Sequence, residues 1–142
     1  MYHVILPLLL GGLIYIAFRS KSLVLFRWFE ELKISELTDL IRFYLFPFKN
    51  HMPNWVIYSL PDGLWTYSFV SSFIFIWNKD SNKWEYWLLI PILISISYEL
   101  LQYFIIFHDT FDILDFFICL VASVLSILIL KIIPKHHEKQ NF

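Results

Sequence analysis

The stretch Glu99-Leu-Leu-Gln-Tyr-Phe-Ile-Ile-Phe-His-Asp-Thr-Phe-Asp-Ile-Leu-Asp115 joins the two longest apolar runs of this chain. One run covers residues 86–107 and the other covers residues 113–131, with a short polar turn between them. A transmembrane helix needs about 20 apolar residues, with about 17 as the lower limit. Both runs reach this length, so the stretch predicts two membrane-spanning helices that meet at a tight turn.

The composition places the chain among integral membrane proteins. Apolar residues make up 58% of the sequence and charged residues 16%, whereas about a quarter of an ordinary soluble domain is charged. The net charge of −1 provides no general attraction to nucleic acid. The lone Cys119 lies inside an apolar run, which excludes a disulfide framework and indicates a small core residue. We therefore predict a single membrane domain, residues 1–142, with the lipid bilayer as its partner and no nucleic acid.

Two further apolar runs, residues 2–19 and 61–77, bring the predicted spans to four. Between them, residues 34–48 repeat apolar side chains at helical spacing, but this segment is too short and too charged to span. Such a helix lies in the headgroup plane or packs over the ends of the bundle. The predicted fold class is all-α: a polytopic membrane four-helix bundle with an amphipathic interfacial helix between helices one and two.

Alternation of four spans brings polar residues from distant parts of the chain to one membrane face. The second span starts there, the third ends there and the fourth starts there, whichever way the protein is inserted. Ionisable groups are costly inside a bilayer and are functional candidates by default. The predicted ligand-binding residues are Asp62, Glu99, Gln102, His108, Asp112 and Asp115.

A cluster of carboxylate and amide oxygens suits several ligands. Oxygen ligands fit hard cations such as Ca²⁺, Mg²⁺ or Mn²⁺, and they also accept hydrogen bonds from a lipid or sugar headgroup. Capping and the helix dipole offer a purely structural account of aspartates that open a helix, such as Asp112 and Asp115. Glu99 and Gln102 have no such account, because they lie at a C-terminal end, where the dipole disfavours a carboxylate. Whether a metal binds, and which one, stays open.

The sequence holds no catalytic nucleophile motif. G-x-S-x-G, P-loop, C-x-x-C and H-E-x-x-H patterns are all absent from the chain. We therefore expect no cofactor, and a non-enzymatic protein is favoured over an enzyme. Hydroxyl residues within the spans are expected to allow close helix approach or to bond across helices. These residues are Ser71, Ser72, Ser95, Ser97, Ser123 and Ser126.

Glu99-x-x-Gln102 ends one span, a short turn follows, and Asp112 and Asp115 open the next span. The order of polar residues in this region resembles the VanZ-like family of small membrane proteins. The likeness covers residues 84–126, and Asp115 takes the place of the family's aspartate at the start of the following helix. Founding members are associated with teicoplanin resistance and the bacterial cell envelope. The resemblance implies a multi-pass protein of the bacterial cytoplasmic membrane. Family members usually carry an arginine in the turn, where this chain has His108-Asp-Thr110, so we expect a net acidic site.

Two functions of different classes are compatible with these patterns. The first is a VanZ-like envelope protein whose acidic pocket binds a lipid-type headgroup, a cationic amphiphile or a divalent cation. The second is a non-enzymatic membrane subunit that assembles with itself or anchors a membrane-protein partner, with pore formation as one form of such assembly. In that case the aromatic helix faces form the interface and the acidic residues serve assembly alone.

Overall fold

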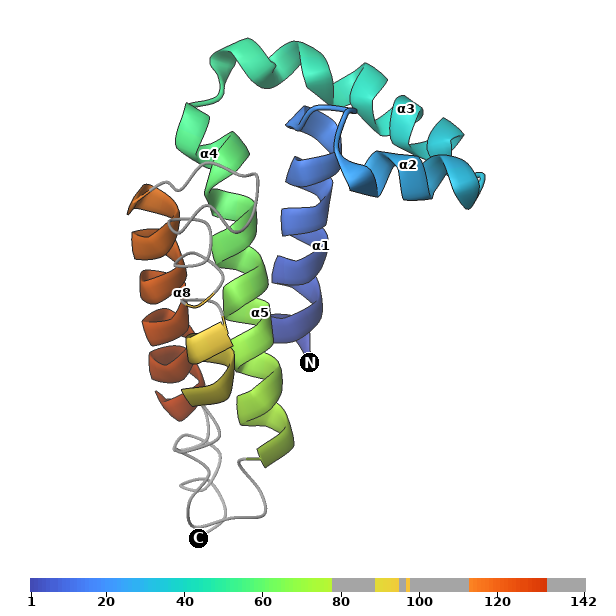
Figure 1. Ribbon diagram of the computed structural model, residues 1–142. Helices are drawn as coiled ribbons and strands as arrows, with labels where there is room; N and C mark the ends of the chain where they lie inside the picture. Colours follow the sequence, from blue (N-terminus) through green and yellow to red (C-terminus); the bar gives the residue numbers. More distant parts are fainter. Residues whose placement is uncertain (78–88, 95–96, 98–112, 133–142) are drawn as a thin grey trace, which may run out of the picture.

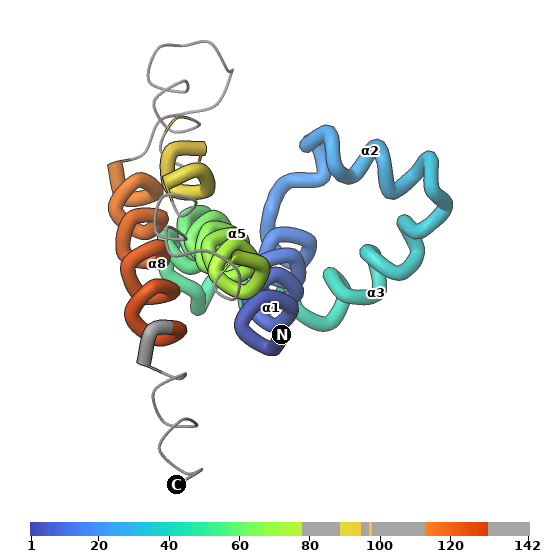
Figure 2. The backbone as a smooth tube through the Cα atoms, turned by 90° about the horizontal axis from the view of Figure 1, so that it is seen from below, coloured from blue at the N-terminus to red at the C-terminus, as the bar shows by residue number. Residues whose placement is uncertain are grey.

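The computed structural model describes residues 1–77, 89–94, 97 and 113–132, and every secondary-structure element in these ranges is a helix. This confirms the predicted all-α class for the described part of the chain. Three longer helices carry the fold: α1 (Tyr2–Phe18), α5 (Leu60–Trp77) and α8 (Ile113–Ile132). They lie side by side with α5 in the middle (Figures 1 and 2).

The contacts between these helices define their directions. Partners across α1 and α5 run in opposite order, since His3 near the start of α1 bonds Tyr67 in α5, whereas Arg19 at the C-cap of α1 lies beside Asp62 in the first turn of α5. Partners across α5 and α8 run in the same order, since Thr66 bonds Cys119 and Ser71 bonds Ser126. Helix α5 is therefore antiparallel to α1 and parallel to α8. One end of the bundle gathers the end of α1 and the starts of α5 and α8 (Figure 1).

Small residues let the three helices approach closely. Gly11 on α1 is buried against Trp65, and a Cβ atom at Gly11 would lie 2.6 Å from Nε1 of that ring. Gly63 on α5 is likewise buried, and a Cβ atom there would overlap Cγ2 of Ile118 on α8. Small residues at helix interfaces are typical of membrane bundles, where close backbone approach replaces hydrophobic driving force.

The buried side chains of the bundle include many hydroxyls. Ser71 and Ser126 donate and accept across the α5–α8 interface at 2.9 Å, as the sequence predicted for these positions. Ser123 instead bonds the carbonyl of Cys119 in its own helix. Cys119 is itself buried, in agreement with the core role that its position indicates. Residues 89–94 form a helical segment, from which Ile92 packs on the apolar cluster of α5 and α8.

The connection from α1 to α5 is an arm with four short helices, where the sequence predicted one interfacial helix over 34–48. These are α2 (Val24–Glu31), α3 (Ser35–Leu45), the 3₁₀ helix η1 (Phe46–His51) and α4 (Asn54–Tyr58). Helices α2 and α3 lie across the end of α1 and extend away from the bundle on the side opposite α8 (Figures 1 and 2).

The reversal between α2 and α3 explains the difference from the prediction. Lys33 has a φ of 57°, and the N–H groups of Lys33 and Ile34 donate to the carbonyls of Glu30 and Phe29. This is the Schellman arrangement that ends helices with a left-handed residue, usually Gly or Asn. Because a lysine occupies that position here, the sequence carries none of the usual signals for the end of α2.

Of the four predicted membrane spans, one has the required length and hydropathy in the described part of the chain. Among the described residues, one helix is long and apolar enough to cross a bilayer, the window Ile113–Leu130 of α8, and α1 is a shorter apolar helix of 17 residues. Helix α5 has 18 residues but opens with Pro61-Asp62-Gly63 and carries several hydroxyls, which lower its mean hydropathy. Most of the predicted third span, residues 86–107, lies outside the described residues.

Candidate functional site

Two of the six predicted ligand residues lie in the described part of the chain. Asp62 is in the first turn of α5 and Asp115 is in the first turn of α8. Both helices start at the end of the bundle where α1 ends, so these two carboxylates share one end as predicted (Figure 1). The other four predicted residues lie outside the described residues: Glu99, Gln102, His108 and Asp112.

Asp62 has a cationic neighbour that the sequence reasoning missed. Nη2 of Arg19, at the C-cap of α1, lies 3.9 Å from Oδ2 of Asp62 and donates to the carbonyl of Tyr58 at 3.2 Å. Both charged side chains are partly buried, at 21% and 31% exposed. The antiparallel packing of α1 on α5 is what brings the last residue of one helix to the first turn of the other.

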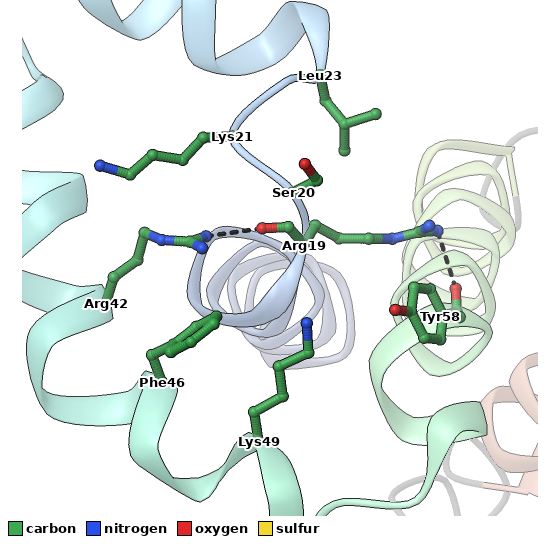
Figure 3. Close-up of a pocket in the computed structure, with 8 residues that line it drawn as sticks. All are labelled: Arg19, Ser20, Lys21, Leu23, Arg42, Phe46, Lys49 and Tyr58. Atoms are coloured by element: carbon green, nitrogen blue, oxygen red, sulfur yellow. Dashed lines mark hydrogen bonds between the residues drawn. The ribbon is translucent and has the colours of Figure 1, made fainter.

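A cavity of about 380 Å³ opens beside this ion pair. Its wall is formed by the end of α1, the turn that follows it, α3, η1 and the end of α4 (Figure 3). The lining side chains include four cations and no carboxylate. They are Arg19, Ser20, Lys21, Leu23, Arg42, Phe46, Lys49 and Tyr58.

Arg42 closes the end of α1 from a distance in sequence. Its Nη1 donates to the carbonyls of Ile16 and Arg19, at 2.8 Å each. Helix α1 has no basic residue in its own last turn, and the last four carbonyls of a helix have no partner within the helix. A guanidinium at this position satisfies such carbonyls and interacts favourably with the negative end of the helix dipole. Arg42 thereby ties α3 to α1.

Aromatic rings hold three of the cations in place. The guanidinium carbon of Arg19 lies 5.0 Å from the ring centre of Tyr58, and that of Arg42 lies 5.1 Å from the ring centre of Phe46. Nζ of Lys49 faces the same Phe46 ring at 5.3 Å. Cation–π contacts stabilise a positive charge without neutralising it, since the ring carries no net charge. The aromatic residues therefore fix these cations while leaving their charge available.

The charge balance of the cavity lining is positive. Of the four lining cations, Lys21 pairs with Asp39 and Arg19 lies beside Asp62. Arg42 and Lys49 form no ion pair with any described residue. The four lining cations and the two carboxylates that lie beside them leave a surplus of two positive charges around the cavity. The sequence prediction of a net acidic site did not include these cations, and its other carboxylates, Glu99 and Asp112, lie outside the described residues.

The site offers binding chemistry rather than a catalytic set. Within the described ranges, no group of three or more His, Cys, Asp or Glu residues is placed to hold a metal ion. The hydroxyl that lines the cavity at Ser20 bonds Ser22, and no histidine lines the cavity to act as its base. Guanidinium and ammonium donors are the groups that bind phosphate or carboxylate oxygens.

Together these features define a small helical protein with a closely packed apolar bundle and a cationic cavity at one end. Comparison of the chain with known protein families, with functionally characterised proteins and with solved structures finds no match.

Proposed function

We propose that this chain is a multi-pass integral membrane protein that binds a lipid-type headgroup at the end where α1 stops and α5 starts. In this proposal it is a non-enzymatic protein of the bacterial cytoplasmic membrane, related to the VanZ-like family. The proposal combines the composition of the whole chain with the distribution of apolar and polar side chains over the helices.

The observation that carries the proposal is an inside-out arrangement of side chains. On α8 the buried residues include Cys119, Ser123 and Ser126, whereas Phe117 and Leu128 are more than half exposed. A soluble bundle places its large apolar residues inside, because their burial from water is the main driving force of folding. In lipid that force is absent between helices, so small and hydroxyl residues form the interfaces and large apolar residues face outward.

Helix α1 follows the same rule. Its buried residues include Pro7, Gly11 and Ala17, while Leu9 is 65% exposed and Leu6 56% exposed. Leucines on the outer faces of both outer helices make a lipid-facing surface on each side of α5. This supports insertion of the whole described bundle, including α1, although α1 is shorter than a full span.

The arm supports a headgroup ligand at the end of the bundle. Helices α2 and α3 expose large apolar side chains, among them Trp28, Leu37 and Phe43. Amphipathic helices of this kind lie at the boundary between headgroups and acyl chains. An arm at that boundary places the cavity between the arm and the bundle at the depth of the lipid headgroups.

Cysteine accessibility tests the insertion. Starting from the Cys119→Ser variant, which has no cysteine, we would introduce Leu9→Cys on α1 and Ser20→Cys in the following turn. Both residues are exposed on the protein surface. A charged maleimide, added to vesicles of both orientations, should label Ser20→Cys quickly and Leu9→Cys only after denaturation in SDS. Equal labelling rates in intact vesicles would refute insertion of α1, because Leu9 is exposed on the protein itself and only lipid would protect it.

A further inference from the structure

We propose that the cavity at the end of α1 binds a phosphate group, with Arg19, Arg42 and Lys49 supplying the donors. This deepens the proposed function by assigning the ligand as anionic and phosphate-bearing. The phosphate belongs either to an anionic lipid headgroup or to free phosphate in solution. The lipid source rests on the proposed membrane insertion, whereas the phosphate chemistry of the cavity does not.

The first argument is the uncompensated charge. Arg42 and Lys49 have no carboxylate partner among the described residues, and their contacts are with backbone carbonyls and aromatic rings. These neutral groups orient the cations without cancelling their charge. A partly enclosed site with surplus positive charge is stabilised by an anion, because the protein walls screen the attraction less than water does.

The second argument is the direction of the side chains. Figure 3 shows Arg42 and Lys49 pointing toward the end of α1, whereas Lys21 points away from that end and the guanidinium of Arg19 extends along the other side to Tyr58. Lys21 is held by Asp39 on α3, so it contributes to the potential rather than to the contacts. The cavity is lined by residues from the end of α1, from α3 and from η1, so the site exists only when the arm is folded over the bundle.

The third argument is unused donor capacity. A guanidinium has five N–H donors, yet the hydrogen bonds of Arg42 within the described residues use Nη1 alone. Nε of Arg19 is buried and has no hydrogen-bond partner there. Guanidinium groups bind phosphate through two parallel hydrogen bonds, and lysine adds a point charge. The volume of about 380 Å³ falls within the range of about 300–1,000 Å³ that is usual for small-molecule sites.

The end of α1 alone would disfavour an anion, because the carbonyls at a helix C-terminus carry a partial negative charge. Arg42 removes this obstacle, since it already binds the carbonyls of Ile16 and Arg19. The same guanidinium thereby covers the negative end of α1 and presents its remaining donors to the cavity.

Native mass spectrometry of the full chain, released from nanodiscs, tests the proposal. The probes are phosphatidylglycerol, which is anionic, phosphatidylcholine, which is zwitterionic, and inorganic phosphate added to detergent-solubilised protein. The test variant is Lys49→Gln, because Arg42 also supports the fold. The matched control is Arg27→Gln, which removes one positive charge from an exposed position of α2 outside the cavity. An unchanged melting temperature of Lys49→Gln, read from the reactivity of buried Cys119, shows that this variant folds.

We expect wild type and Arg27→Gln to retain phosphatidylglycerol in preference to phosphatidylcholine. Lys49→Gln should retain phosphatidylglycerol at least about tenfold less, as expected for the loss of one hydrogen bond between charged groups. If inorganic phosphate alone binds and shows the same dependence on Lys49, the site is a free-phosphate site and the proposal also stands. Equal retention by Lys49→Gln and Arg27→Gln, or no binding of either probe by wild type, would overturn it. Protection of Leu9→Cys in that case would show that insertion survives the failure of the phosphate site.

Discussion

Replacement of Gly11 by alanine tests the packing of α1 on α5 directly, because the neighbouring Gly12 provides a matched control. A Cβ atom at Gly11 would lie 2.6 Å from Nε1 of Trp65 and 3.2 Å from the carbonyl oxygen of Pro61. A Cβ atom at Gly12 would have no neighbour within 4 Å. Both substitutions make the same chemical change in the same helix, and only their surroundings differ.

The free energies of unfolding of the Gly11→Ala and Gly12→Ala variants should differ by about 1–3 kcal/mol. Alanine is favoured over glycine inside a helix by roughly 0.5–1 kcal/mol, and this gain applies to both positions. At Gly11 the added methyl group also overfills the interface, at a cost of about 1–3 kcal/mol. Trp65 cannot simply turn aside, because its ring packs on Tyr15 with 5.4 Å between ring centres. The helix-propensity gain cancels in the comparison, so the difference reports the overlap alone.

The single cysteine provides the assay. Cys119 is buried at 4% exposure, so a maleimide that fluoresces on reaction reports unfolding as the detergent-solubilised protein is heated. For a chain of this size, about 2–4 °C per kcal/mol predicts a difference in Tm of roughly 2–12 °C. Gly12→Ala should melt at or slightly above the wild-type temperature, and Gly11→Ala below Gly12→Ala. Equal melting temperatures for the two alanine variants would show that Gly11 does not pack against α5 as described.

Two further predictions concern contacts between distant parts of the chain. A double-mutant cycle of Ser71→Ala and Ser126→Ala, followed by the same melting assay, should give a coupling energy of about 0.6 kcal/mol. This is the average for hydrogen bonds between membrane helices. Strictly additive effects of the two substitutions would contradict the hydrogen bond between Ser71 and Ser126. Arg42→Gln should increase the rate of amide hydrogen exchange in α2 and α3 and leave the rate in α5 and α8 unchanged. The reason is that it removes the hydrogen bonds that hold α3 to the carbonyls of Ile16 and Arg19. Unchanged exchange in α2 and α3 would show that Arg42 does not hold the arm to α1.

The helical elements were largely predictable because their signals are local. Apolar runs predicted helices over 2–19, 61–77 and 113–131, and the structure has α1, α5 and α8 there, with one end of each shifted by one residue. The end of α2 escaped prediction because Lys33 adopts the left-handed conformation that glycine or asparagine usually supplies. Local signals fail where an ordinary residue takes an unusual backbone conformation.

The candidate site was predictable only in its position. Alternating helices placed Asp62 and Asp115 at one end of the bundle, and both helices do start there. The cations at that end were missed, because Arg19, Arg42 and Lys49 lie in different segments of the sequence. They line one cavity because α3 folds back over α1. The side-chain periodicity within either segment does not predict the contact between the two helices.

The sequence by itself determined that this protein is helical, that its helices are long apolar runs and that polar groups collect at the ends of these runs. These properties follow from hydrogen bonding within four residues and from the side-chain repeat of the helix. Only the tertiary structure decided that Arg42 binds the carbonyls of Ile16 and Arg19 and that Lys49 lines the same cavity as Arg19 and Arg42. Such contacts join residues 23 or more positions apart, and they depend on how whole helices pack rather than on any neighbour in the chain.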